Sequence, residues 1–121
     1  MLLVDDDNLV RHAVARLLRA NGFRVLEAGD GLQALEVDAA SGPPDLLVSD
    51  IVMPKMGGLE LAAAIDKRHP GLPVLFISGF APEEALRDRL SRPATSFIGK
   101  PFTAAEFAAA VWAAQPGLQP S

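Results

Sequence analysis

Short apolar runs alternate with longer, partly polar segments along the chain. Runs of this kind, bounded by Gly, Pro, Asn or Asp, are typical of β-strands. Two of them, LLV at 2–4 and VLFI at 74–77, contain no polar residue, as expected for strands buried on both faces of a parallel sheet. The predicted strands lie at 2–4, 23–28, 45–50, 72–78 and 96–99.

The segments between these strands carry helical signals. In the first segment one apolar helix face is formed by Val10, Ala13, Val14, Leu17 and Leu18. One helix start is marked by the N-cap candidate Asp30, and another by the capping box of Thr103 and Glu106. The predicted helices lie at 8–21, 31–40, 58–69, 82–91 and 103–114.

Strand and helix therefore alternate five times. This order predicts an α/β fold with a doubly wound, five-stranded parallel sheet between two helical layers, a three-layer α/β/α arrangement. The length of 121 residues suits one domain, which we assign to residues 1–114. The remaining residues, 115–121, contain two Pro, one Gly and no charge, so we expect a flexible C-terminal tail.

Composition narrows the functions that such a fold could serve. The net charge of −4 argues against direct binding of nucleic acid. The chain has no Cys, which excludes disulfides and thiolate metal sites and is compatible with a cytoplasmic protein. No apolar run approaches the ~18 residues of a membrane span, and the N-terminus has no signal-peptide pattern. We therefore expect no membrane insertion of this domain.

Reactive side chains follow four of the predicted strands. The acidic run 5–7 follows the first strand, and Asp50 ends the third. Ser78 ends the fourth strand, and Lys100 follows the fifth. The carboxyl ends of parallel strands meet at one edge of a sheet, so these groups should converge there. Two carboxylates ~5 Å apart repel each other by roughly 3 kcal/mol, which a divalent cation with oxygen ligands, such as Mg²⁺, would offset.

Four motifs at these strand ends resemble the receiver (phosphoacceptor) domain of two-component response regulators. They are LLVDDDNLVR, DLLVSDIVMPKMGGLEL, VLFISG and FIGKPF. Each is a modest signal alone, but the four in this order are specific. The resemblance covers about residues 1–114 and implies the (βα)5 flavodoxin-like fold of that family.

The resemblance implies a phosphoacceptor and a metal site. Asp50 would accept a phosphoryl group from a phosphohistidine and would also be a metal ligand. Asp6 would bind Mg²⁺ directly, and Asp5 would bind it directly or through water. The backbone carbonyl of Val52 would complete the protein ligands.

Further roles follow from the same resemblance. Ser78 would donate a hydrogen bond to a phosphoryl oxygen, and Lys100 would pair with the phosphoryl group and, before reaction, with the phosphoacceptor. Pro101 would follow a cis peptide bond. Phe97 lies at the position of the family's switch aromatic, although a simple core role is an equal alternative. Gly58 would allow a tight turn into the third helix.

The resemblance also implies partners. The phosphoryl donor would be a histidine kinase or a histidine phosphotransfer domain in a phosphorelay, and a homodimer is a further option. Two contexts stay open, a stand-alone regulator and the receiver of a hybrid histidine kinase, with the pattern between 74 and 107 favouring the second. The domain would catalyse its own phosphorylation and dephosphorylation, and so would not be a conventional enzyme.

Two other functions compete with this interpretation. One is a pseudo-receiver, a binding module of the same fold that is never phosphorylated. The apolar Val52 and Phe80 occupy positions that are polar in many family members, but no reactive position is missing. The other is a haloacid-dehalogenase-type phosphohydrolase. It is disfavoured because Leu9 occupies a position where that family has Thr or Val.

Several residues near the predicted site are assigned ordinary roles. We expect Asp7 at the N-terminus of the first helix rather than on the metal, and Glu27 to be solvated at the rim where the second strand ends. His12 and His69 lack a recognisable partner and are predicted to be surface histidines. Leu9 lies outside the apolar helix face and is predicted to be exposed beside the site, where a partner could dock; an isolated surface Leu without a partner is an equal alternative.

Overall fold

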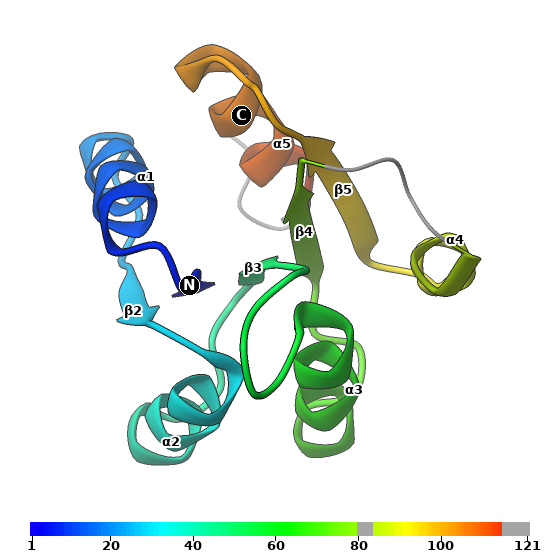
Figure 1. Cartoon of the computed structure of the whole chain (residues 1–121). Helices are drawn as coiled ribbons and strands as arrows, with labels where there is room; N and C mark the ends of the chain where they lie inside the picture. The colour runs from blue at the N-terminus through cyan, green and yellow to red at the C-terminus, as the bar shows by residue number, and fades with distance from the viewer. Residues whose placement is uncertain (80–83, 115–121) are drawn as a thin grey trace.

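The computed structural model describes residues 1–79 and 84–114 and contains five strands and five helices in strict alternation (Figure 1). The strands are β1 (Leu2–Val4), β2 (Leu26–Ala28), β3 (Leu47–Asp50), β4 (Val74–Ser78) and β5 (Thr95–Gly99). The helices are α1 (Asn8–Ala20), α2 (Gly31–Ser41), α3 (Gly58–Arg68), α4 (Glu84–Leu90) and α5 (Ala104–Ala114). The predicted alternation is confirmed.

The strands form one parallel sheet in the order β2-β1-β3-β4-β5. Successive strands are therefore added on opposite sides of β1, which lies between β2 and β3. The carboxyl ends of β1 and β3 are neighbours, because Val4 is in register with Ser49. This places the residue after β1 beside the last residue of β3, as the doubly wound arrangement requires.

Two apolar cores fill the space between the sheet and its helices. On one face, α1 and α5 pack on alternate strand residues such as Leu3, Val48 and Leu75. On the other face, α2, α3 and α4 pack on the intervening residues, such as Val4 and Phe76. Figure 1 shows these two helical layers on opposite sides of the sheet. Because both faces are covered, β1 and β4 are buried along their whole length, as their uninterrupted apolar sequences predicted.

The helix starts follow the expected capping chemistry. Asp7 caps α1 and accepts hydrogen bonds from the backbone N–H groups of Leu9 and Val10 at 3.0 and 3.1 Å. Asp30 caps α2, and the Thr103–Glu106 capping box closes with two bonds of 3.0 Å. The two acceptor bonds explain why Asp7 faces the helix and not the neighbouring acidic side chains.

Two element predictions need correction. The second strand begins at Leu26 instead of 23, because Phe23 and Val25 pack into the core under α1 and α5. On α1 the buried face includes Ala15, whereas Ala13 is exposed, so the stripe is rotated slightly from the predicted one. Residues 80–83 and 115–121, which include the predicted helix start at Pro82 and the predicted tail, lie outside the described residues.

Within the described ranges, no helix combines the length and apolarity that crossing a bilayer requires. The longest of those helices, α1, has 13 residues, and one of its faces is charged.

Candidate functional site

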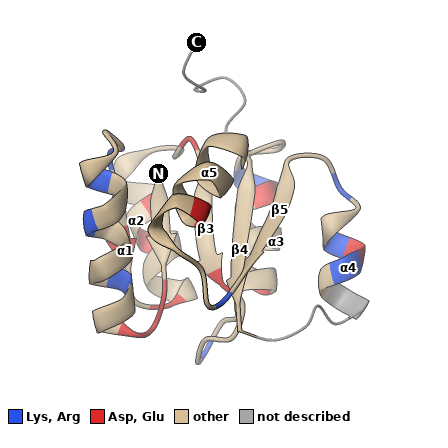
Figure 2. Cartoon of the chain, turned by 90° about the horizontal axis from the view of Figure 1, so that it is seen from above, with Lys and Arg blue, Asp and Glu red and all other residues tan. Residues whose placement is uncertain are grey.

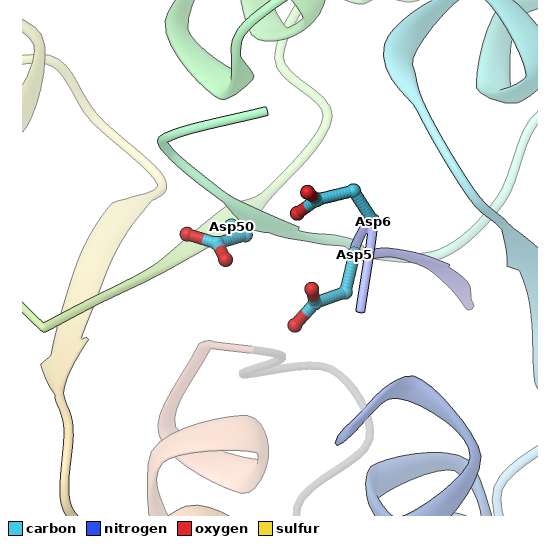
Figure 3. A group of neighbouring side chains, drawn as sticks. All are labelled: Asp5, Asp6 and Asp50. Carbon is cyan, nitrogen blue, oxygen red and sulfur yellow. The ribbon is translucent and has the colours of Figure 1, made fainter. Parts of the chain in front are cut away.

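Three carboxylates converge at the carboxyl edge of the sheet. Asp5 and Asp6 follow β1, and Asp50 ends β3; one carboxylate oxygen from each lies within 4.8 Å of the others. Figure 3 shows Asp50 opposite the pair from β1. Asp5 is almost completely buried, Asp50 is half-buried and Asp6 is exposed. The predicted convergence of these side chains is therefore present.

Burial raises the pKa of Asp5 above its ordinary value, and the negative charges of Asp50 and Asp6 raise it further. The backbone N–H of Asp7, which donates to Asp5 Oδ1 at 2.9 Å, and the charge of Lys100 act in the opposite direction. The net shift is upward, so the charged form of Asp5 is held at a cost in the folded, metal-free protein. A site with this property favours a cation.

This shift gives a pH-dependent prediction for stability. An acid whose pKa is higher in the folded state loses stability as pH rises from its unfolded pKa through its folded pKa. We therefore expect Asp5→Asn, which keeps an oxygen acceptor for the Asp7 N–H, to be more stable than the wild type at neutral pH in EDTA. The advantage should vanish below the ordinary pKa of Asp. Urea unfolding of both proteins across this range measures it, and a constant difference would contradict the prediction.

A cation already lies beside the cluster. Lys100 Nζ is 3.4 Å from Asp50 Oδ2 and 4.0 Å from Asp5 Oδ2. Its backbone N–H donates to the Ser78 carbonyl at 2.8 Å, and the Lys100–Pro101 peptide bond is cis. Ser78, the last residue of β4, is buried. The ends of β3, β4 and β5 thus bring Asp50, Ser78 and Lys100 to the same edge of the sheet.

The loop after β3 is held against the site by a glycine. A Cβ on Gly58 would lie 2.2 Å from the Asp50 carbonyl oxygen, so only glycine permits α3 to begin this close to the end of β3. The Gly58 N–H donates to the Ile51 carbonyl at 2.9 Å. Val52, in the same loop, is 62% exposed, and its N–H lies 3.4 Å from Asp50 Oδ1. Its exposure leaves an apolar group on the rim of the site.

The chemistry of the donors suits Mg²⁺. Three carboxylates offer hard oxygen ligands within the span of one ion, and two of them, Asp6 and Asp50, are accessible to solvent. Burial, together with the charges of Asp50 and Asp6, raises the pKa of Asp5, and a bound cation would offset the cost of its negative charge. These residues fit a divalent cation.

The two aromatic positions noted in the sequence have different outcomes. Phe97, in β5, is half-buried and packs against the core under α3 and α4, beside its register partner Phe76. This contact agrees with the core interpretation, and a switch role stays a prediction. Phe80 lies outside the described residues.

Two predictions about surface residues were wrong. Glu27 was predicted to be solvated, but its carboxylate, on β2, accepts from Arg11 and Arg19 at 3.2 and 3.3 Å. His69 Nε2 lies 2.8 Å from Asp38 Oδ1, and Asp38 is buried. The contacts of Glu27 with Arg11 and of His69 with Asp38 join residues 16 and 31 positions apart, for which the sequence carried no local signal.

The family model for the response regulator receiver domain matches residues 1–112. This chain belongs to the response regulator receiver family. It is therefore a receiver domain of two-component signal transduction. The match spans β1 to α5 and contains every residue of the candidate site described above.

Curated relatives include larger signalling proteins. The sensor kinase CckA of Brucella abortus is 37% identical over 112 residues, which are 92% of this chain and 12% of CckA. The response regulator MprA of Mycobacterium ulcerans is 37% identical over 112 residues, 90% of this chain and 47% of MprA. The chain thus spans less than half the length of these relatives.

Solved structures of receiver domains superpose closely on this receiver domain. The chemotaxis protein CheY4 of Vibrio cholerae has a TM-score of 0.85 at 27% identity, covering 93% of this chain and 95% of CheY4. The receiver domain of NtrX from Brucella abortus has a TM-score of 0.85 at 34% identity, covering 95% and 97%. The receiver domain of the hybrid histidine kinase CckA has a TM-score of 0.78 at 35% identity, covering 94% and 96%. The flavodoxin-like fold is confirmed.

Proposed function

We propose that this receiver domain accepts a phosphoryl group on Asp50 from a phosphohistidine, in a reaction that requires Mg²⁺. The observation that carries the proposal is the convergence of Asp50 with Asp5, Asp6 and Lys100 at one sheet edge. A carboxylate at the centre of such a site, 3.4 Å from an ammonium group, can act as a nucleophile toward a phosphoryl group.

The chain's own residues account for the transfer. An Asp50 oxygen attacks phosphorus, a P–O bond forms, and the P–N bond of the phosphohistidine breaks. The electron pair stays on the histidine nitrogen, which takes a proton from solvent. Lys100 and the Ser78 hydroxyl stabilise charge on the phosphoryl oxygens, and Lys100 changes partner from the carboxylate to the phosphoryl group. Bound Mg²⁺, held by Asp5, Asp6, Asp50 and the Val52 carbonyl, would supply further positive charge to those oxygens.

A direct test uses a small phosphodonor. Incubation with acetyl phosphate and Mg²⁺ should add the mass of one phosphoryl group, and hydroxylamine should remove it, as expected of an acyl phosphate. No mass shift would contradict phosphoryl transfer and favour a pseudo-receiver. EDTA should prevent the labelling, and labelling in EDTA would contradict the metal requirement.

The donor protein would dock where apolar groups surround the site. Leu9 is 83% exposed in the first turn of α1, and Val52 lies on the loop after β3. A groove of about 270 Å³ between α1 and the start of α5 is lined by Ala13, Val14, Leu17, Phe102, Thr103 and Ala104. A mainly apolar surface next to the phosphoacceptor fits the helix of a histidine kinase or histidine phosphotransfer domain. We infer that this receiver domain acts in the cytoplasm, where such partners expose their phosphohistidine.

Leu9→Glu tests this docking surface. The substitution should slow transfer from a phosphorylated kinase or phosphotransfer domain by about tenfold, the effect of losing ~1.4 kcal/mol at an interface. Labelling by acetyl phosphate should not change, because Leu9 points away from the core and caps no helix. Rates for both donors, measured side by side, check this. A parallel loss with both donors would mean that the substitution damages the site itself.

A further inference from the structure

Arg11 binds the backbone of the acidic cluster. Its side chain, on the second turn of α1, is 11% exposed, and Nη1 donates a hydrogen bond of 2.9 Å to the Asp5 carbonyl. Nε donates to Glu27 Oε1 in β2 at 3.2 Å. The guanidinium group thus joins α1, the end of β1 and β2 at one point. Arginine suits this place because its planar group offers several donors in a fixed geometry.

The carbonyl that Arg11 binds belongs to the peptide unit between Asp5 and Asp6. Before this unit, the Asp5 N–H donates to the Ala28 carbonyl at 3.2 Å, the last bond of this strand to β2. After it, the chain leaves the sheet and turns into α1. The orientation of this one peptide unit therefore sets the directions of two of the three clustered carboxylates.

The charge of Arg11 is balanced on the side away from the cluster. Glu27 is 22% exposed and accepts from Arg11 and also from Arg19, with His12 3.6 Å away. The main effect of Arg11 on the cluster is therefore to hold the Asp5 carbonyl in place, because Glu27 balances its positive charge. Figure 2 shows the basic residues of α1 as separate bands along the helix, with acidic residues in the loop that precedes it.

We propose that Arg11 is a positioning residue that fixes the Asp5–Asp6 peptide unit for binding of Mg²⁺. This inference rests on the proposed metal-dependent function. Groups that orient metal ligands without touching the ion commonly change metal affinity 10–100-fold when they are replaced. The Arg11 guanidinium is a group of this kind, because it binds the backbone carbonyl of Asp5.

The chain supplies a matched control in Arg19. Its Nη1 binds the same Glu27 carboxylate at 3.3 Å, and its Nη2 binds the Val25 carbonyl at 2.9 Å. Val25 lies before β2, at the opposite end of that strand from the site. Arg19→Gln therefore removes an ion pair to Glu27 and a backbone hydrogen bond, as Arg11→Gln does, but the bond it removes is remote from Asp5.

The experiment is calorimetric titration of Mg²⁺ into the wild type, Arg11→Gln, Arg11→Lys and Arg19→Gln. We expect Arg11→Gln to bind Mg²⁺ about tenfold more weakly than the wild type. Arg11→Lys should fall between them, because one ammonium group can bind the Asp5 carbonyl but cannot also replace the second branch of the guanidinium. Arg19→Gln should bind as the wild type does. Urea unfolding in EDTA should show similar losses for Arg11→Gln and Arg19→Gln.

Equal affinities of Arg11→Gln and the wild type, or equal losses in Arg11→Gln and Arg19→Gln, would overturn the positioning role. In both cases the wild type would still bind Mg²⁺, so the proposed function would stand. A wild type that binds no Mg²⁺ would overturn both. If Arg11→Gln does not fold, Arg11→Lys decides: weaker binding than Arg19→Gln supports the role, and equal binding overturns it.

Discussion

Asp50→Asn is expected to abolish covalent labelling by acetyl phosphate in Mg²⁺. The amide that replaces the carboxylate lacks the negative charge and the nucleophilic oxygen that the transfer needs. In the wild type, Lys100 lies 3.4 Å from this carboxylate, and in the proposed mechanism it would bind the incoming phosphoryl group. Intact-mass spectrometry after a fixed incubation measures the labelled fraction, which should fall to background.

The control for this experiment is Asp7→Asn. Asp7 lies in the same acidic run but caps α1, and Asn is an equally good N-cap residue. The control should therefore be labelled like the wild type. Labelling that persists in Asp50→Asn would move the phosphoacceptor to another side chain and would overturn the assignment.

Asp6→Asn is expected to weaken Mg²⁺ binding at least about tenfold, the lower end of the losses seen when groups outside the ligand shell are replaced. Asp6 is exposed, and one of its carboxylate oxygens lies within 4.8 Å of oxygens from Asp5 and Asp50. Removing its charge leaves the ion with two carboxylates. Titration calorimetry of the variant against the wild type gives the ratio of dissociation constants.

Asp7→Asn is again the control, because it removes a negative charge from the acidic run without removing a predicted metal ligand. Its two hydrogen bonds to the N–H groups of Leu9 and Val10 hold the side chain at the helix terminus. We expect its Mg²⁺ affinity to stay close to the wild-type value. Similar losses in Asp6→Asn and Asp7→Asn would mean that Mg²⁺ responds to the local negative charge and not to a defined ligand set.

Much of this arrangement was predictable from local patterns. The runs LLV and VLFI marked the two strands that are buried on both faces, because a strand covered by helices on both sides has no polar position. Asp30 and the Thr103–Glu106 pair marked helix starts, since capping depends on residues within one turn. The parallel order then placed Asp50 and Lys100 at the same sheet edge.

Local patterns failed where a contact joins distant segments. Glu27 and His69 were predicted to be ordinary surface residues, but each pairs with a charged residue on another element, Arg11 and Asp38 respectively. The second strand was predicted three residues too long at its start. Phe23 looks like a strand residue in the sequence, but its ring packs 4.6 Å from that of Trp112 in α5.

The sequence by itself determined which reactive groups end the strands, because hydrophobic periodicity and helix caps mark where each strand and helix ends. The helix cap formed by Asp7 was also predictable, because its hydrogen bonds go to residues two and three positions away. Only the tertiary structure decided how Asp5 and Asp6 differ: Asp5 is buried, with Lys100 4.0 Å away, and Asp6 faces solvent. This difference depends on groups such as Lys100, which the fold brings in from another element, and no pattern within the acidic run records it.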